Sequence, residues 1–288
     1  MRQLPGVASK LPPLRPAAPP RGILHANEPS AEREHQRVLP PASLSEYIAH
    51  FWTVRWSLKE PELVETLPHP TVHVIFEEVR GASPRAEVVG VPRGRFTRRL
   101  EGEGDVFAIK FRPAMLQPFI VEDVGSLRGR VIALSELFAG ENRQLENQIF
   151  GSNSLEERIT AVERFLLPRI ARISEQRFRE LLPLRNLVES METSRSLLRV
   201  EQAAALVDWD LRTLQRRFQR HLGVSPKWVI LRYRLHEAAE RLREANPPSL
   251  AALAAELGYA DQAHFARDFS KIVGCSPARF SAAHRSVR

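Results

Sequence analysis

The 288-residue chain contains a single cysteine, Cys275, and no run of about 18 consecutive apolar residues. One cysteine excludes an internal disulfide and a cysteine-clustered zinc site. Without a long apolar run there is no candidate transmembrane helix. The Pro-rich opening, Met1 to Pro20, also lacks the apolar core of a secretory signal. We therefore expect a soluble protein of a reducing compartment, most simply the cytoplasm, with no membrane partner.

Signatures of catalysis are missing as well. The chain has no Walker A loop, no GxGxxG after a strand, no GxSxG elbow and no HExxH. No pair of carboxylates stands out for acid–base work, and the lone Cys275 follows Gly274 at an expected helix end, where no nucleophile role is expected. We expect no enzyme, no catalytic residue and no cofactor.

Positive charge is present and unevenly distributed. The chain has 42 Lys+Arg against 34 Asp+Glu, a formal net charge of +8. Residues 1–174 carry 23 basic and 21 acidic side chains, whereas residues 175–288 carry 19 and 13. A net charge of +6 in the shorter part attracts a polyanion, either nucleic acid or an anionic membrane, although a solvated surface without a partner fits the charge equally well.

The first half of the chain gives signals of disorder and then of strands. Nine of the 22 prolines fall within residues 1–41, which predicts an unstructured segment over 1–38. Within 39–135, residues 72–76 and 106–112 alternate between two faces and glycines separate the runs, as in a small antiparallel barrel or sandwich.

Two helices are expected around this β-rich domain. The first would begin at Ser43 and bury Leu44, Tyr47, Ile48, Phe51 and Trp52. The second lies in a helical connector, 136–177, where Ser154 and Glu157 form a capping box. Its apolar stripe is Leu155, Ile159, Val162 and Leu166. Such a stripe packs against its own domain or forms a dimer seam, and both interpretations stay open.

The last hundred residues contain a repeat. Asp210–Phe218 followed by Gly223–Pro226 aligns with Asp261–Phe269 followed by Gly274–Pro277, an offset of 51 residues. In each copy the Asp caps a helix, the Phe fills the core, the Gly ends the helix in a left-handed conformation, and Ser-Pro opens the next helix. An Ala-rich helix precedes each copy, over 200–207 and 250–257. The pattern predicts two helix-turn-helix units within a domain spanning 178–288.

The second helix of each unit presents a polar face suited to reading base edges. Burial of Leu211, Leu214, Phe218 and Leu222 leaves one exposed face on the first helix. The predicted DNA-binding residues of that face are Arg212, Gln215, Arg216 and Gln219. Burial of Phe265, Phe269 and Ile272 on the second helix leaves Gln262, His264 and Arg267. Arg pairs with guanine and Gln with adenine in the major groove; the alternative is a solvated face on an ordinary helical bundle.

These residues give the chain a specific resemblance. The segment from Val200 to Phe280 resembles the DNA-binding domain of the AraC/XylS family of bacterial transcription regulators. The stretches that carry it are 214–218 (LQRRF), 223–226 (GVSP), 257–259 (LGY), 261–265 (DQAHF) and 275–277 (CSP). The resemblance implies a long linker helix, Pro226 to Glu244, between the two units. Asp208 stands where the family commonly has Gly, but Asp tolerates the left-handed region well enough to keep the turn.

The N-terminal part has a weaker resemblance, to the domain of one uncharacterised subgroup of these regulators. Its stretches are 39–41 (LPP), 50–52 (HFW), 67–70 (LPHP), 90–92 (GVP) and 111–113 (FRP). In the family at large this position holds a cupin-like barrel for effector binding and dimerisation. His50, His69 and His73 do not have the spacing of a cupin metal motif, so no metal is expected. Trp52, His69 and His73 are the candidate ligand-binding residues.

The fold class expected is α+β: a β-rich, barrel- or cupin-like sensor domain followed by an all-α domain. The function expected is sequence-specific binding of double-stranded DNA to regulate transcription initiation. Two recognition helices would enter successive major grooves about 34 Å apart. RNA polymerase, a small-molecule effector and a second copy of the chain are the further partners expected. A non-specific architectural DNA binder and a barrel enzyme with a helical regulatory domain are the alternatives.

Overall fold

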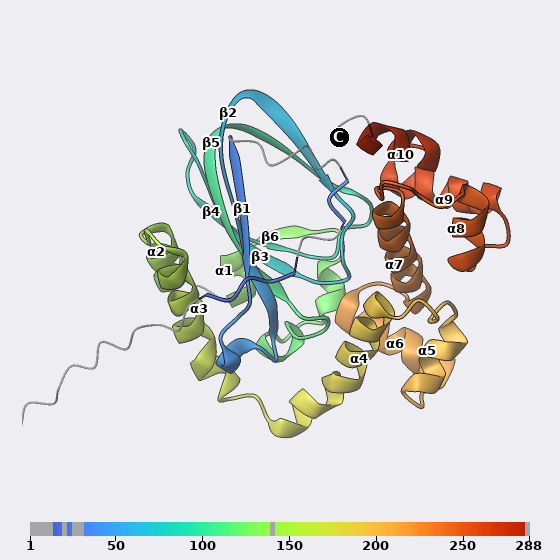
Figure 1. Cartoon of the computed structure of the whole chain (residues 1–288). Coiled ribbons are helices and arrows are strands. Elements are labelled where there is room, and N and C mark those ends of the chain that lie inside the picture. Colours follow the sequence, from blue (N-terminus) through green and yellow to red (C-terminus); the bar gives the residue numbers. More distant parts are fainter. Residues whose placement is uncertain (1–13, 19–21, 25–31, 139–141, 286–288) are drawn as a thin grey trace, which may run out of the picture.

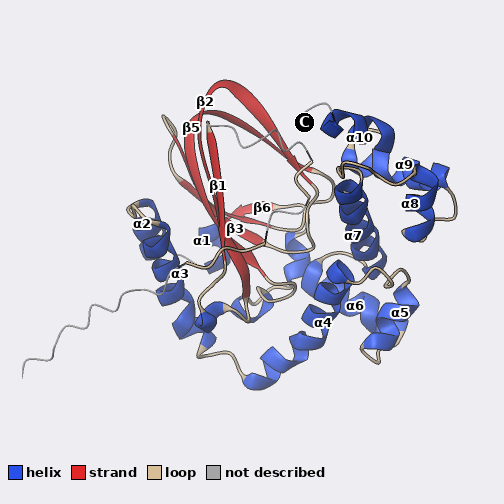
Figure 2. Ribbon diagram, viewed as in Figure 1, coloured by secondary structure: helices blue, strands red, loops and turns tan. Residues whose placement is uncertain are grey.

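The computed structural model describes residues 14–18, 22–24, 32–138 and 142–285. Its first part is a β-sheet with helices beside it, and its second part is helical throughout (Figures 1 and 2). The strands are β1 Arg33–Val38, β2 Ile48–Thr66, β3 His73–Val79, β4 Arg85–Val89, β5 Phe96–Phe111 and β6 Val131–Ala133. The α-helices are α1 Leu134–Phe138, α2 Arg143–Phe150, α3 Leu155–Ile170, α4 Glu175–Thr193, α5 Val200–Leu206, α6 Leu211–Leu222, α7 Pro226–Arg241, α8 Leu250–Glu256, α9 Gln262–Val273 and α10 Pro277–Arg285. The α+β class expected from the sequence is confirmed.

The six strands form one antiparallel sheet in the order β1-β2-β5-β3-β4-β6. Its long central strands, β2 with 19 residues and β5 with 16, form a curved ribbon at the top of Figure 1. The pairing of β2 with β5 is irregular between Leu58 and Glu62, opposite the left-handed Gly102, and an irregularity of this kind bends a strand. Among the described residues the sheet has two edges, β1 and β6, so it is open rather than closed as a barrel.

The prediction of a helix that begins at Ser43 is wrong. A 3₁₀ turn, Ala42–Leu44, leads instead into β2 at Ile48. A register shift between Ile48 and His50 adds one residue to the strand, so Ile48 and Phe51, three apart, both face the main core. A bulged strand therefore imitates the i, i+3 spacing of a helix over this short stretch.

The two faces of the sheet carry different apolar clusters. Phe107, Ile109 and Phe111 of β5 belong to the main core, which α2 and α3 cover. The alternate residues Val106 and Ala108 belong to a second cluster whose members all come from strands. The alternation predicted over 106–112 is confirmed.

The apolar stripe of α3 is buried within its own chain. Ser154 Oγ accepts a hydrogen bond from Glu157 N at 3.2 Å, which confirms the predicted cap. The carboxylate of Glu157 reaches back to Asn153 N at 3.0 Å. Val162 and Leu166 are 0% and 2% exposed and lie in the main core. The stripe is therefore not a dimer seam.

Two segments differ from the organisation expected. Residues 1–38 were expected to lack structure, but β1 occupies Arg33–Val38 because its backbone pairs with β2; residues 1–13, 19–21 and 25–31 lie outside the described residues. Helix α4 begins at Glu175, three residues before the expected boundary at 178, since Ser174 Oγ accepts a hydrogen bond from Arg177 N at 3.2 Å. The apolar side of α4 enters the main core through Leu184, Leu187 and Val188.

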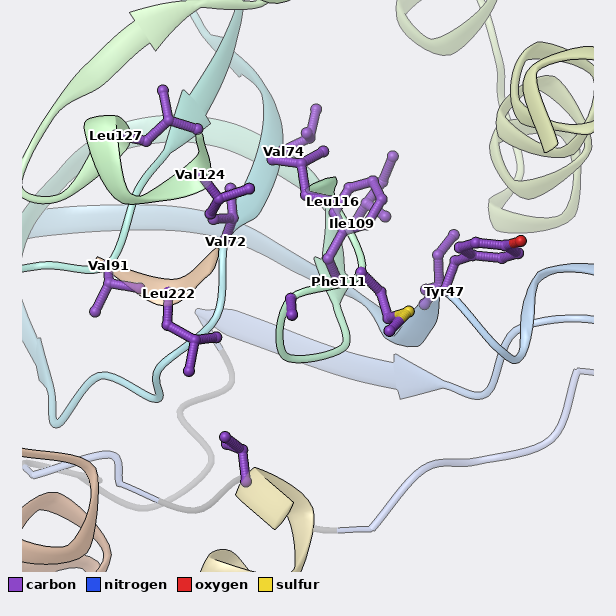
Figure 3. Packing of buried hydrophobic residues seen from close by; sticks show 14 of the residues in the cluster. Tyr47, Val72, Val74, Val91, Ile109, Phe111, Leu116, Val124, Leu127 and Leu222 are labelled. Atoms are coloured by element: carbon purple, nitrogen blue, oxygen red, sulfur yellow. The ribbon is translucent and has the colours of Figure 1, made fainter. Parts of the chain in front are cut away.

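The main core continues from the sheet into the first helical unit. Leu214, Phe218 and Leu222 of α6 belong to the same buried cluster as the strand residues. Figure 3 places Leu222 close to Val91 and Val124 of the N-terminal part. The sheet domain and the first helical unit are thus held together by shared apolar packing.

Candidate DNA-binding surface

The first helical pair, α5 and α6, has the geometry that the sequence predicts. Asp208 adopts a left-handed conformation (φ 51°) in the turn between the two helices. Asp210 Oδ1 then accepts a hydrogen bond from Thr213 N at 2.7 Å, and this bond keeps the pKa of the Asp210 carboxyl below its usual value. Gly223 ends α6 with φ 73° and donates its N–H to the carbonyl oxygens of Phe218 and Gln219. Each end of α6 is therefore fixed by the residue proposed for it.

The second pair, α8 and α9, repeats this construction. Asp261 Oδ1 accepts a hydrogen bond from His264 N at 2.7 Å at the start of α9. Gly274 ends α9 with φ 91° and donates its N–H to Ser270 O at 2.9 Å. The repeat read from the sequence is a repeat of structure.

Helix α7 connects the two pairs. Ser225 Oγ accepts a hydrogen bond from Trp228 N at 3.2 Å, and Pro226 is the first helical residue. Leu235, Ala238 and Leu242 are fully buried, whereas Trp228 and Leu231 are half-buried. α7 contacts α4 and both helices of the first pair, α5 and α6.

The side chains expected to read DNA lie on the surface. All seven are exposed: Arg212, Gln215, Arg216, Gln219, Gln262, His264 and Arg267. Among the described residues, none of the four on α6 makes a side-chain hydrogen bond or ion pair. His264 differs, because its Nε2 lies 3.6 Å from Asp268 Oδ2 and its ring packs on Tyr259. The exposed positions of α6 are thus free to contact a ligand, and those of α9 are partly engaged.

Two details of the buried faces differ from expectation. Leu211 is 43% exposed because it begins α6, where no preceding turn covers it. On α9 the third buried residue is Val273, at 0% exposure, and Ile272 is half-buried, because the stripe follows the 265, 269, 273 spacing of one helix face.

The N-terminal part contacts the carboxyl-terminal ends of both recognition helices. At α6, a 3₁₀ turn, Val124–Leu127, packs so closely that a side chain on Gly125 would overlap the carbonyl oxygen of Gln219. Arg220 Nε also donates to Asp123 Oδ1 at 2.8 Å. At α9, Arg95 Nη1 donates to the carbonyl oxygen of Val273 at 2.7 Å.

These contacts involve equivalent positions of the repeat. Gly223 and Gly274 occupy the same place in the two units, and each lies against the N-terminal part, Gly223 at Gly125 and Arg128, Gly274 at the guanidinium of Arg95. Gly125 and Arg95 were not predicted as contact residues, because nothing in a glycine or an isolated arginine indicates which surface it meets.

The three candidate ligand-binding residues are divided between two places. Trp52 Nε1 donates to His73 Nδ1 at 3.2 Å, so these two lie together on the sheet. His69 lies instead at the boundary with α4 and α7, where its Nδ1 is 3.5 Å from Glu192 Oε1 and its ring contacts that of His236 at a tilt of 37°. Among the described residues no three His, Cys, Asp or Glu side chains converge as metal ligands.

The described helices include none that is both long and apolar enough to span a lipid bilayer. Cys275 is half-buried, and burial raises the pKa of its thiol. A raised pKa disfavours the thiolate that a nucleophile requires.

Comparison with known families divides the chain as the fold does. Residues 203–283 match a helix-turn-helix domain, and residues 36–133 match a domain of unknown function, DUF6597. An uncharacterized HTH-type transcriptional regulator from Haemophilus influenzae is 35% identical over 81 residues, which is 28% of this chain and 27% of that protein. The HTH-type transcriptional activator RhaS from Pectobacterium carotovorum is 36% identical over 67 residues, 23% of this chain and 24% of RhaS. The chain thus matches about a quarter of the length of these curated relatives.

Solved structures resemble the chain over its helical part or over most of its length. The DNA-binding domain of AdpA, solved with a target DNA, is 30% identical and covers 37% of this chain and 96% of its own, with a TM-score of 0.33. ToxT from Vibrio cholerae is 8% identical and covers 87% of this chain and 98% of its own, with a TM-score of 0.43. From the family matches and the paired helices, residues 203–283 are a helix-turn-helix domain of the AraC type, joined to a DUF6597 domain over residues 36–133.

Proposed function

We propose that this protein binds specific DNA sequences through α6 and α9 and thereby regulates transcription. The observation that carries the proposal is the repeated unit: two helices with the same caps, each presenting exposed polar side chains on the face that its core residues leave free. The packing of an ordinary helical bundle does not require the same two-helix unit to occur twice. The alternative function, non-specific architectural DNA binding, would also use the surface charge, but it would not require the repeated unit.

Base reading falls to the exposed faces of the two helices. Arg212, Gln215 and Arg216 contact base edges in one major groove, and Arg267 with Gln262 and His264 contacts those in the next. The other arginines and the amide groups at the helix starts hold phosphates. The protein acts where bacterial DNA is, in the cytoplasm, and RNA polymerase is the partner through which a bound regulator alters initiation.

The sheet domain regulates this binding through the ends of the recognition helices. It touches α6 at Gly125 and α9 at Arg95, so a shift of the sheet domain alters the relative placement of both helices. A change in their spacing alters which pairs of major-groove sites they reach together. A small-molecule effector or a second copy of the chain acts by moving this domain.

Selection of bound sequences from random DNA with the full-length protein tests the proposal. We expect an enriched motif with two half-sites about one helical turn apart. Binding that is equal for all duplexes supports the architectural alternative and contradicts ours. Turnover of a substrate by the sheet domain, with no enriched motif, supports an enzyme.

Arg216→Ala is expected to weaken binding to the selected site by about 1–3 kcal/mol and to leave binding to random DNA nearly unchanged. The reason is that Arg216 is exposed and unpaired in the described structure, free to form a two-pronged contact with guanine. Titration by fluorescence anisotropy on both duplexes measures the two affinities. Arg80→Ala, an exposed arginine beyond β3, is the control for lost charge. An equal loss on both duplexes would assign Arg216 to a phosphate.

The helical part is expected to fold and bind DNA alone. The fragment should begin at Ser174 rather than at 178, because Ser174 caps α4 and α4 packs on α7. Circular dichroism measures folding, and the selected duplex measures binding. A fragment 174–288 that is unfolded would show that the shared core makes the two parts one folding unit.

A further inference from the structure

Four basic or imidazole side chains lie side by side across neighbouring strands on the sheet face that carries the second apolar cluster. Lys110 of β5 stands directly opposite His50 of β2 and His73 of β3. Directly opposed residues of antiparallel strands have Cβ atoms about 4.5–5.5 Å apart. Arg37 of β1 completes the set, which we call the cationic row. Lys110 and His50 are only 9% and 8% exposed, so the row is largely withdrawn from water.

Hydrogen bonds determine which atoms of the two imidazoles carry protons. Arg37 Nη2 donates to His50 Nε2 at 2.9 Å and also lies 3.3 Å from His50 Nδ1, and Trp52 Nε1 donates to His73 Nδ1 at 3.2 Å. A ring nitrogen that accepts a hydrogen bond is unprotonated, so each ring is neutral, and His73 carries its N–H on Nε2. Burial and the nearby Lys110 hold the pKa of His50 at about 2 and that of His73 at about 3. The cationic row therefore contains the Lys110 ammonium, the Nε2–H of His73, and a guanidinium that already donates to His50 and to the carbonyl oxygen of Ala18.

The row has little negative charge to balance it. Among the described residues, Lys110 Nζ makes no hydrogen bond and no ion pair. Burial lowers the pKa of Lys110 to about 8, and Glu192, near the end of α4, opposes that shift from a longer range. A buried ammonium without a direct partner is costly unless an anion approaches it. Glu192 is also 3.5 Å from His69, so its carboxylate is shared.

Apolar surface lies next to the row on the same face. Trp52 and Ile75 stand opposite Ala108, which is two residues before Lys110 on β5 and faces the same side of the sheet. The side chains of Trp52 and Ile75 are half-buried and pack against the second apolar cluster. We propose that this face binds a small organic carboxylate, whose charged group meets Lys110 and the Nε2–H of His73 and whose apolar part lies on Trp52 and Ile75. The bound carboxylate takes the place of Glu192 as the counterion of the row. Because Glu192 lies one residue before the end of α4, which leads into α5, binding then reaches the DNA-binding part; this last step rests on the proposed function.

A pair of probes that differ only in charge tests the binding itself, on the full-length chain and without DNA. Benzoate and benzamide share one shape, and inorganic phosphate supplies an anion without an apolar part. We expect benzoate to raise the thermal unfolding midpoint of the protein and to change its tryptophan fluorescence, since a ligand that binds only the folded state stabilises it. Benzamide and phosphate should have no effect at the same concentration. Lys110→Met should abolish the benzoate response, and Lys59→Met, at an exposed lysine of β2, should keep it.

Lys110→Met keeps the length of the side chain and removes a desolvated charge, so the variant should fold at least as stably as the parent. A benzoate response equal in the parent and in Lys110→Met would overturn the proposal, as would equal responses to benzoate and benzamide, a stronger response to phosphate, or no response at all. None of these outcomes depends on DNA binding. Failure of the protein to select a DNA motif would therefore leave the carboxylate site standing.

Discussion

Gly125→Ala is expected to separate the sheet domain from the first recognition helix. The added methyl group would overlap the carbonyl oxygen of Gln219, and backbone on both sides cannot move aside as a flexible side chain could. Overpacking of this kind costs about 1–3 kcal/mol, and more where backbone is involved. We expect a lower free energy of unfolding for the full-length chain and faster amide hydrogen exchange at the end of α6.

The separation should also change DNA binding. With the contact broken, the affinity of the full-length variant should approach that of fragment 174–288, because α6 is no longer positioned by the sheet domain. Gly94→Ala is the matched control, since nothing lies within 4 Å of its added methyl group. Unchanged stability and exchange in Gly125→Ala, equal to those of Gly94→Ala, would show that the sheet domain does not dock on α6 in solution.

The sequence predicted the helical part well because the residues that begin and end its helices act over a few neighbouring positions. Asp210 and Asp261 accept hydrogen bonds from backbone amides three residues later in the chain, and Gly223 and Gly274 adopt the left-handed conformation that few other residues accept. Such features need no knowledge of the rest of the fold. The exposure of the predicted base readers follows from the same periodicity.

The strand region was harder because its periods are short and interruptible. One inserted residue between Ile48 and His50 gave a strand the spacing of a helix. The alternation over 106–112 could be predicted from the sequence. Both faces of β5 are buried there, however, so the pattern did not indicate that Lys110 is a buried lysine. A lysine inside a strand whose neighbours on both faces are apolar is the signal that would have indicated the cationic row.

Contacts between the two parts of the chain could not be predicted at all. Arg95 and Val273 are 178 residues apart, and their hydrogen bond depends on how the two domains meet. The same holds for Gly125 at Gln219. No periodicity or spacing encodes such a contact, because each partner is compatible with many surfaces.

The two recognition helices are expected to contribute unequally to DNA sequence recognition. The exposed face of α6 offers Arg212, Gln215, Arg216 and Gln219, and in the described structure none of these side chains is engaged. The equivalent positions of α9 are Ala263, Ala266, Arg267 and Ser270. Ser270 Oγ already donates to Ala266 O at 2.7 Å, and an alanine can offer only apolar contact, for example to a thymine methyl. The second unit therefore has fewer base readers and relies more than the first on phosphate contacts and DNA shape.

Replacing the three readers Arg212, Gln215 and Arg216 by alanine should reduce affinity for the selected site at least about 100-fold, since each base contact is worth about 1–3 kcal/mol. The matched triple variant of α9, with Gln262, His264 and Arg267 replaced, should lose much less specific affinity. The α9 variant should instead show a weaker dependence of affinity on salt concentration, because a protein that makes fewer phosphate contacts releases fewer counterions on binding. Selected sites should show a sharp half-site under α6 and a degenerate one under α9. Half-sites of equal information content, or a larger loss of specificity from the α9 variant, would contradict this division, because α9 would then read as many bases as α6 with fewer long, unengaged side chains.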